Sequence, residues 1–502
     1  MKRYILFRIL RSITSIILVT TVAYAMIFAL VPRKSIFVGD TTYSRLQGDP
    51  DKRTNYENTV FRKMGYIEFI QLDDIAQRIT GTKEGAEFDA IMNGEEEAAI
   101  LKWAEENRED GWELHQLPVA KTYYATREIP VVQRVLRFYG NIFEVDHPWK
   151  VHDPDNPDLP RYVRFEYTPE AGLTLTGSGT KHKYLLYFNS SFPFLHQNFI
   201  KLNLGVSYPT FQNREVMDVI FSGQGKTASR EITFETGKTE DSPINIYSRQ
   251  YQQTAKIDRL QRERFQDNYT LTDNNYRDPS MAQISLTMGV IALLITYAIG
   301  LPVAVFMARY KGRWGDRIGI ALVTVLISVP SLAFIYFFRF LGNALFGLPG
   351  DFPVLGGENI RSYILPTVIL GLLSVSGLVI WVRRYMIDQA SSDYVLFARA
   401  KGLSEREISR NHILKNAMIP IVNNIPAAVI LSIAGATITE TVFAVPGMGK
   451  MLPDAIKANN NSMVIGLVFI FTTLSILSVL LGDILMTIVD PRISLSAKKG
   501  VH

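Results

Sequence analysis

The segment over residues 397–407 combines small, basic and helix-capping residues, and it reads Phe-Ala-Arg-Ala-Lys-Gly-Leu-Ser-Glu-Arg-Glu. Its pattern predicts a first short helix that Asp393 caps and that ends at Gly402, because glycine readily adopts the left-handed conformation beyond a helix end. Ser404 and Glu407 have the spacing of a capping box, which predicts the start of a second helix. The segment therefore reads as a helix-turn-helix.

The chemistry of this segment would be recognition of another protein and not catalysis. Basic side chains could meet acidic groups on a partner, while alanines keep the surface thin enough for close approach. The residues concerned are Ala398, Arg399, Ala400, Lys401, Leu403 and Arg406. The same composition also fits an ordinary basic loop at a membrane surface, and the residues alone do not decide between the two.

Polar residues within apolar runs form a second candidate site, because polar groups are costly inside a membrane. The apolar run 419–438 and the positions just after it contain four such residues, namely Asn423, Asn424, Thr439 and Glu440. They are the residues expected for a hydrated translocation path. Hydrogen bonds between helices would use the same groups, so that alternative stays open.

Six apolar runs must position both sites, since each is long enough to cross about 30 Å of hydrocarbon as a helix. We expect them near 12–31, 283–308, 318–342, 363–382, 419–438 and 463–488. Ala23-Tyr24-Ala25 fits a signal-peptidase site, but the first run continues to Val31. A retained helix is therefore expected there.

The positions of basic residues predict the orientation, because Lys and Arg accumulate in cytoplasmic loops. The amino terminus, the loop after the second run, loop 383–418 and the carboxyl-terminal tail are basic and are expected inside the cell. Residues 36–280 are then expected outside it.

Charge divides the chain in the same way. Residues 32–280 carry 31 Lys and Arg against 37 Asp and Glu, a net charge of −6, whereas the rest carries +11. The basic excess thus reflects membrane topology, and no nucleic-acid partner is expected. The chain has no cysteine, which excludes disulfides, thiolate catalysis and cysteine-bound zinc.

The expected domains are 1–35 with the first helix, 36–280 outside the membrane, and 281–502 with the remaining five helices. Alternating or apolar runs at 162–167, 184–188 and 231–235 predict strands, and 84–108 predicts helix. About 245 residues can bury a core of their own, so a mixed α+β domain is expected.

Residues 398–404, with Ala417 and Pro420, resemble the coupling-loop signature of ATP-binding-cassette (ABC) importer permeases, in the form typical of oligopeptide and dipeptide permeases. The general motif begins Glu-Ala-Ala, but this chain has Leu396-Phe397-Ala398, so the interactions of that glutamate cannot be transferred. Further stretches resemble the family, namely 198–208, 439–443, 446–449 and Asp490-Pro491-Arg492. The arginine-rich first helix resembles the B-type subunit, and the long insertion resembles its Gram-positive variant.

The resemblance implies a polytopic α-helical membrane protein with six spans and the type I importer fold, in which the α+β domain lies outside the cytoplasm between the first two spans. It implies a permease subunit of an ATP-driven oligopeptide importer, paired with a second homologous permease within membrane lipid. Two cytoplasmic ATPase subunits would bind the 393–416 segment, and an extracellular lipoprotein would deliver the peptide. ATP and Mg would be bound by those ATPases, so neither enzymatic activity nor a cofactor is expected in this chain.

Two other functions remain open at this point. The permease could carry another solute such as nickel or a glycoside, although few histidines argue against a metal route. Alternatively, residues 36–280 could be the ligand-binding domain of an envelope sensor. No metal site is expected, because the pair His147 and His152 fits a solvated loop. Residues 223–227 lack the first glycine of a phosphate-binding loop.

Overall fold

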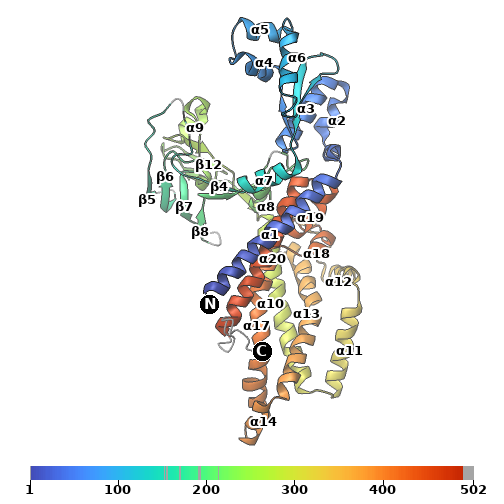
Figure 1. The fold of residues 1–502 in the computed structure, drawn as a ribbon. Helices are drawn as coiled ribbons and strands as arrows, with labels where there is room; N and C mark the ends of the chain where they lie inside the picture. The colour runs from blue at the N-terminus through green and yellow to red at the C-terminus, as the bar shows by residue number, and fades with distance from the viewer. Residues whose placement is uncertain are drawn as a thin grey trace.

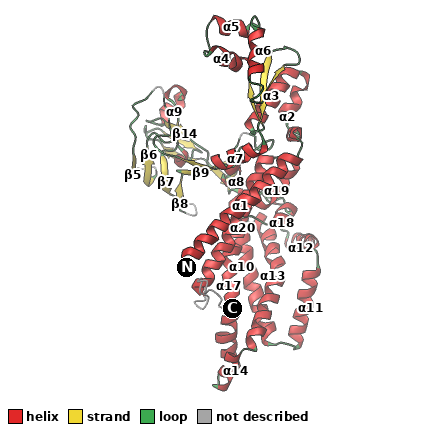
Figure 2. Cartoon of the chain, in the orientation of Figure 1, coloured by secondary structure: helices red, strands yellow, loops and turns green. Residues whose placement is uncertain are grey.

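The computed structural model describes residues 2–489, except 152, 154–155, 169–170, 190–193 and 213. His152 and the carboxyl-terminal signature Asp490-Pro491-Arg492 therefore lie outside the described residues. A bundle of long helices carries two lobes at one end, both built from the region between the first two long helices (Figure 1). Figure 2 shows that strands are confined to these lobes.

Five helices of the bundle, one of them taken together with a short neighbour, are long and apolar enough to cross a membrane. They are α1 Lys2–Leu30, α10 Met281–Arg309, α13 Arg361–Ala390, α17 Ile419–Ile433 with α18 Thr437–Val442, and α20 Asn461–Val489. The central pair α10 and α13 approaches closely at Gly371, where an added Cβ would lie 3.0 Å from the carbonyl oxygen of Ala292. The Thr296 hydroxyl donates to the Gly371 carbonyl at 2.9 Å and ties the two helices together.

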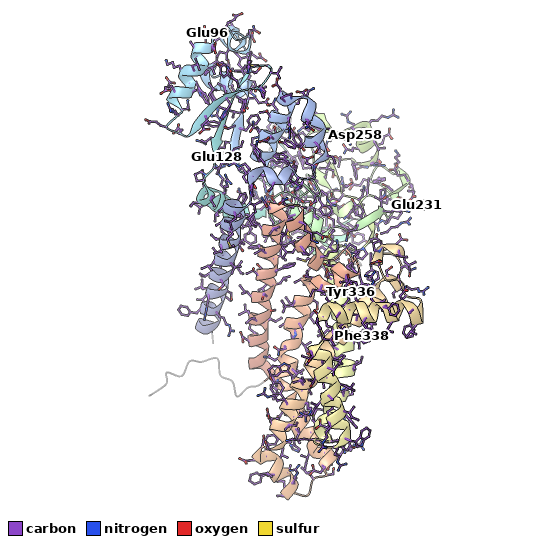
Figure 3. All side chains as sticks on the ribbon, turned by 90° about the vertical axis from the view of Figure 1, so that its right-hand side faces the viewer. Glu96, Glu128, Glu231, Asp258, Tyr336 and Phe338 are labelled. Carbon is purple, nitrogen blue, oxygen red and sulfur yellow. The ribbon has the colours of Figure 1, made fainter. Side chains whose placement is uncertain are left out.

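The third expected span, 318–342, is wrong as a single straight helix. The chain forms α11 Trp314–Ser328 and α12 Ser331–Phe346, which are bent by 105°. The bend lies at Pro330. Proline has no N–H and disfavours the helical conformation in the residue before it, and Val329 is indeed extended with ψ 126°. Figure 3 shows α12, with Tyr336 and Phe338, lying across the end of the bundle.

The fifth expected span, 419–438, is also interrupted. After α17 the backbone leaves the helical conformation at Gly435, where φ is +80°, and α18 starts at Thr437. A further helix, α19 Met448–Lys457, then leads to α20. Asn423 and Glu440, which the sequence places along and just beyond one apolar run, therefore do not lie on one continuous helix.

The first lobe covers residues 33–141 and packs helices against a small sheet. Its strands pair antiparallel in the order β1-β3-β2, and its core contains Ile75, Ile100, Trp103 and Trp112. The helices are α2 Thr41–Arg45, α3 Pro50–Lys63, α4 Leu72–Thr80, α5 Ala86–Met92, α6 Glu97–Glu106 and α7 Val131–Asn141. The strands are β1 Ile67–Ile70, β2 Trp112–Gln116 and β3 Tyr123–Glu128. The helices predicted within 84–108 are thus present as α5 and α6.

The second lobe covers residues 143–278 and is mostly β. Its main sheet is antiparallel with the order β5-β6-β7-β8, and the three strands predicted from the sequence are present as β5, β7 and β11. The strands are β4 Phe143–Val145, β5 Val163–Thr168, β6 Gly172–Gly177, β7 Tyr184–Phe188, β8 Leu195–Gln197, β9 Ile200–Leu202, β10 Gln224–Thr227, β11 Arg230–Thr233, β12 Thr239–Ser242, β13 Gln250–Tyr251, β14 Tyr269–Leu271 and β15 Tyr276–Asp278. The described part of this lobe also contains the short α-helices α8 Val216–Phe221 and α9 Arg259–Arg264.

Buried polar contacts fasten the lobes to the bundle. Asn460, which precedes α20 and is fully buried, donates to the hydroxyl groups of Ser207 and Thr210 at 2.8 and 2.7 Å. The neighbouring Tyr208 hydroxyl donates to the buried carboxylate of Asp40 in the first lobe. Although burial disfavours the charged form, the hydrogen bonds from Tyr208 and Tyr56 hold the pKa of Asp40 below its usual range. The segment around Tyr208 thus joins both lobes to the start of α20.

Candidate coupling and translocation site

The predicted docking segment forms the far tip of the bundle, as helix α14 Asp393–Ala400 (Figure 1). Ser392, and not Asp393 as expected, occupies the position before the first helical residue, and its side chain makes no capping bond. Val395 and Ala398 are buried in one apolar cluster with Ile408 and Ile413, and this cluster extends to Ala304 of α10 and Val382 of α13. Our interpretation of Ala398 as part of a thin exposed surface is therefore wrong, since its methyl group faces the chain's own interior.

The turn after α14 has the predicted form. Gly402 has φ +78°, its N–H donates to the Arg399 carbonyl at 2.9 Å, and the Leu403 N–H donates to the Ala398 carbonyl at 3.3 Å. This is the Schellman pattern, which satisfies carbonyls at a helix end. The Ser404–Glu407 capping box that starts α15 Glu405–Glu407 is complete: the Ser404 hydroxyl accepts from the Glu407 N–H, and the Glu407 carboxylate accepts from the Ser404 N–H.

One ion pair spans this turn. The Arg399 guanidinium donates to both carboxylate oxygens of Glu405, at 2.8 and 3.3 Å. The hydrogen bond from Arg399 holds the pKa of Glu405 below its usual range. Both groups are largely exposed, as are Ala400, Lys401 and Arg406, so the turn presents charge and small side chains to its surroundings.

A return helix connects the tip to the bundle with almost no interruption. After α15 the chain continues as a π-helix over Ile408–Leu414, then α16 Lys415–Ala417 and α17. Ile408 and Ile413 are buried in the same cluster as Val395. A displacement of the tip would therefore be transmitted directly to α17.

Two apolar side chains at the tip were missed by our reading of the sequence. Phe397 is 70% exposed and Leu396 is 56% exposed, although they lie between buried neighbours on α14. The available signal was an apolar pair directly before the small residues of an otherwise polar, exposed segment. Aromatic side chains such as Phe are enriched at the centre of protein interfaces relative to the rest of the protein surface.

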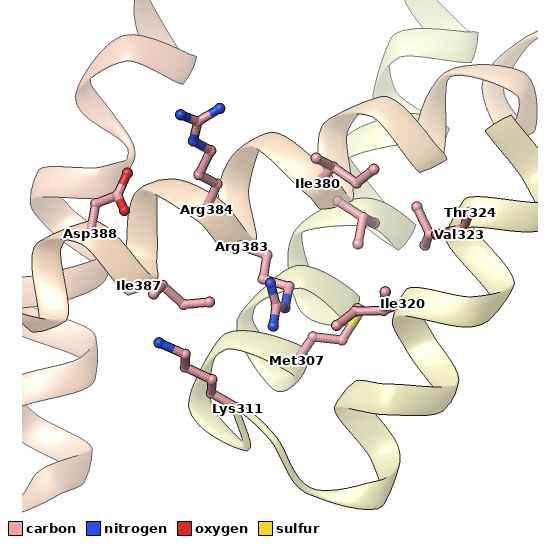
Figure 4. Close-up of a pocket in the computed structure, with 11 residues that line it drawn as sticks. Met307, Lys311, Ile320, Val323, Thr324, Ile380, Arg383, Arg384, Ile387 and Asp388 are labelled. Atoms are coloured by element: carbon pink, nitrogen blue, oxygen red, sulfur yellow. The ribbon is translucent and has the colours of Figure 1, made fainter.

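A buried ion pair stiffens the base of the tip. Asp316 of α11 is 1% exposed and accepts from Nε and Nη2 of Arg383 on α13 at 2.7 and 2.8 Å. The Gly312 N–H donates to the same carboxylate at 2.7 Å. Arg383 lies beside a slot of about 420 Å³ between α10, α11 and α13, which Figure 4 shows lined by Met307, Ile320 and Lys311.

Glu440 is the centre of a hydrogen-bond network at the other end of the bundle, which we call the α18 knot (Ser285, Ala436, Glu440, Met448 and Lys450). Glu440 is 1% exposed, and its carboxylate accepts from the Ser285 hydroxyl at 2.8 Å and from the N–H groups of Ala436 and Lys450 at 3.0 and 2.9 Å. Ser285 in turn accepts from the Met448 N–H at 2.8 Å. The network joins α10, α18 and α19.

The four predicted path residues thus lie in two different surroundings. Thr439 and Glu440 are buried inside the chain and do not line an open surface, because the break at Gly435 turns α18 inward. Asn424 is exposed on α17. Asn423 is half-buried, and its Oδ1 atom is buried without a hydrogen-bond donor among the described residues. A role of Asn423 and Asn424 in the path stays a prediction.

Comparison with known proteins identifies the family. Residues 300–495 match the family profile described as the inner membrane component of binding-protein-dependent transport systems. The chain is 51% identical to the oligopeptide transport system permease protein AmiC of Streptococcus pneumoniae serotype 4, over the full length of both proteins.

More distant relatives match only part of the chain. The dipeptide transport system permease protein DppB of Lactococcus lactis is 33% identical over 213 residues, which cover 42% of this chain and 69% of that protein. Among solved structures, an inward-facing MetNI methionine ABC transporter covers 42% of this chain and 94% of its own, with 17% identity and a TM-score of 0.32. A likeness of that size supports no structural argument.

These matches confirm the resemblance noted in the coupling segment and the function it implied. The chain is a multi-pass membrane protein and a transporting subunit, and ATP hydrolysis belongs to partner subunits of such importers. The chain belongs to the oligopeptide family of ABC importer permeases, which have the type I importer fold.

Proposed function

We propose that this permease forms the translocation path with a second homologous permease and is driven through its α14 tip by two cytoplasmic ATPase subunits. The observation that carries the proposal is the arrangement of α14, which is buried on the side of Val395 and Ala398 and exposes Phe397 and Leu396. An ATPase groove would receive the exposed apolar pair. The Gly402 turn would lie against its rim.

The orientation follows from the same arrangement. With α14 in the cytoplasm, the amino terminus is cytoplasmic and residues 36–280 lie outside, where they would receive peptide from an extracellular substrate-binding lipoprotein. Asn423 and Asn424 of α17 would face the second permease or the peptide between the two. The Oδ1 atom of Asn423 has no donor among the described residues, which supports this, because buried polar atoms nearly always find a partner.

Substitution of the exposed aromatic tests the docking proposal. Phe397→Ala should reduce co-purification of the ATPase subunits at least tenfold, as expected for an interface hot spot worth about 1.4 kcal/mol or more. Phe340→Ala is the matched control, since Phe340 is 69% exposed on α12 at the opposite end of the bundle. Equal ATPase recovery from the two variants would refute docking at the α14 tip.

Single-cysteine labelling tests the orientation, and the chain has no native cysteine to interfere. Asp241→Cys in the second lobe should react in intact cells with a maleimide that cannot cross membranes. Lys401→Cys at the tip should react only after the membrane is permeabilised. The reverse pattern would overturn the proposed topology.

A further inference from the structure

A polar cavity of about 1090 Å³ lies between the second lobe and the first turn of α10. Its walls include Tyr187 and His196 of the main sheet and Asp218 of α8, and Ser280 and Gln283 border it at the start of α10. Its volume is slightly above the range of about 300–1,000 Å³ that is usual for ligand-binding pockets. The cavity therefore has room for a ligand larger than a single amino acid.

Two carboxylates of the cavity wall have no direct ion-pair partner among the described residues. In the described part of the chain, Asp218 and Asp273 form neither an ion pair nor a side-chain hydrogen bond, and both remain accessible from the cavity. The cavity walls partly remove water from both groups, which raises the pKa of each carboxyl above its usual range; Lys201 and Arg214 partly offset this rise, and repulsion by Glu215 adds to it. A positively charged ligand group would relieve this repulsion.

The cavity also presents a cation and apolar surface. Arg230 is exposed and unpaired within the described residues. Tyr187 is stacked between His196 and Tyr247, with ring centroids 5.3 and 4.3 Å apart. Asn274 is exposed at the wall with its amide free of intramolecular bonds among the described residues. One cavity therefore offers partners for an ammonium group, a carboxylate, an amide and a side chain.

We propose that this cavity is a peptide-binding site of the inserted region, in which Asp218 and Asp273 bind the terminal ammonium group of a peptide and Arg230 its terminal carboxylate. A free peptide carries all the groups that the cavity complements. The proposal rests on the outward placement of residues 36–280 proposed above. The site would hold peptide next to α10 after release by the lipoprotein.

Peptide affinity can be measured on the complete importer in lipid nanodiscs without the lipoprotein. The probe is the tritiated pentapeptide Ala-Ala-Phe-Ala-Ala, used with either a free or an acetylated amino terminus. Wild type should bind the free peptide at least tenfold more tightly than the acetylated one. The double variant Asp218→Asn/Asp273→Asn should bind the free peptide at least tenfold more weakly and should discriminate between the two peptides less than twofold.

Asp241→Asn is the matched control, because Asp241 is an exposed carboxylate on β12, away from the cavity wall, and it should bind both peptides like wild type. Equal affinity of wild type and the double variant would overturn the site. So would a double variant that keeps its peptide affinity but no longer associates with the lipoprotein, since the cavity would then be a docking surface. Failure of the topology alone would appear in the Asp241→Cys labelling and would leave these affinities unchanged.

Discussion

The two ends of the helix bundle differ in the range and burial of their hydrogen bonds. In the turn over residues 399–407 at the α14 tip, the side-chain hydrogen bonds of the described residues join positions at most six apart, and the side chains they use are exposed. In the α18 knot, Glu440 is buried and bonds to Ser285, which is 155 positions away. The structure of the tip is determined by neighbouring residues and is exposed for contact with a partner, whereas the knot holds distant parts of the same chain together.

This difference separates two kinds of mutational effect. Substitutions in the knot should unfold or loosen the permease, because buried polar groups that lose a partner are costly. Substitutions at the tip should leave the fold intact and change only what the partner recognises. Stability and transport measured on the same variants can therefore test the comparison.

The largest loss of stability is expected from Glu440→Ala. Removing the carboxylate leaves the hydroxyl of Ser285 and the N–H groups of Ala436 and Lys450 without their acceptor, at a cost of about 3 kcal/mol. Thermal melting of the purified importer in detergent measures the loss.

The control for that variant is Glu231→Ala, since Glu231 is exposed on β11. Glu440→Gln should recover part of the stability, because its amide oxygen can still accept from some of the three donors. A Glu440→Ala permease that melts like wild type would show that the knot is not what joins α10, α18 and α19.

A smaller loss is expected behind the tip, at the Asp316–Arg383 pair. Asp316→Asn leaves the Arg383 guanidinium without its charged partner, at a cost of about 2 kcal/mol, which is below the range for a fully buried pair because the Arg383 side chain is 21% exposed. The double variant Asp316→Leu/Arg383→Leu should be closer to wild type, because no unpaired charge remains. Melting curves of wild type, the single variant and the double variant measure these differences in stability. A double variant less stable than Asp316→Asn would contradict this account.

The smallest effect is expected from Arg399→Gln at the tip. The Arg399–Glu405 pair is solvent-screened, so the melting temperature at pH 7 should not change measurably. Because the pair depresses the pKa of Glu405, its slight contribution is present above the unfolded-state pKa of about 4.3 and disappears as the pH falls below that value. A clear drop in melting temperature at pH 7 would mean that the tip, too, holds the fold together.

The comparison also explains how far the sequence could predict this molecule. The Gly402 turn and the Ser404–Glu407 box were predictable because each depends on residues within one helical turn. The α18 knot was not, because nothing near Glu440 in the sequence points to Ser285. Proline at position 330 is visible in the sequence and is a possible cause of a bend. Membrane helices nevertheless tolerate proline when neighbours satisfy the freed carbonyls, so the residue alone does not predict whether the helix bends.

The sequence also could not predict which individual side chains of α14 are buried. Ala398 and Ala400 look equivalent in the sequence, yet only Ala398 packs against the bundle. Which face of α14 turns inward depends on the returning helix over Ile408–Leu414 and on a cluster that extends to α10, and the residues of α14 alone do not show how these pack. The family was nevertheless evident from the sequence, because several separate motifs agreed.

The central claim is that the Gly402 turn couples the permease to its ATPases, and paired glycine substitutions test it most directly. Gly402 and Gly312 both have φ +78°, and a Cβ at either would meet no atom within 4 Å. Gly402→Val and Gly312→Val therefore impose similar backbone strain of about 1–2 kcal/mol. Peptide uptake and peptide-stimulated ATP hydrolysis would be measured on both, at equal amounts of protein in the membrane. We predict that Gly402→Val lowers both at least tenfold while Gly312→Val stays within twofold of wild type. Equal activity of the two variants would contradict the account.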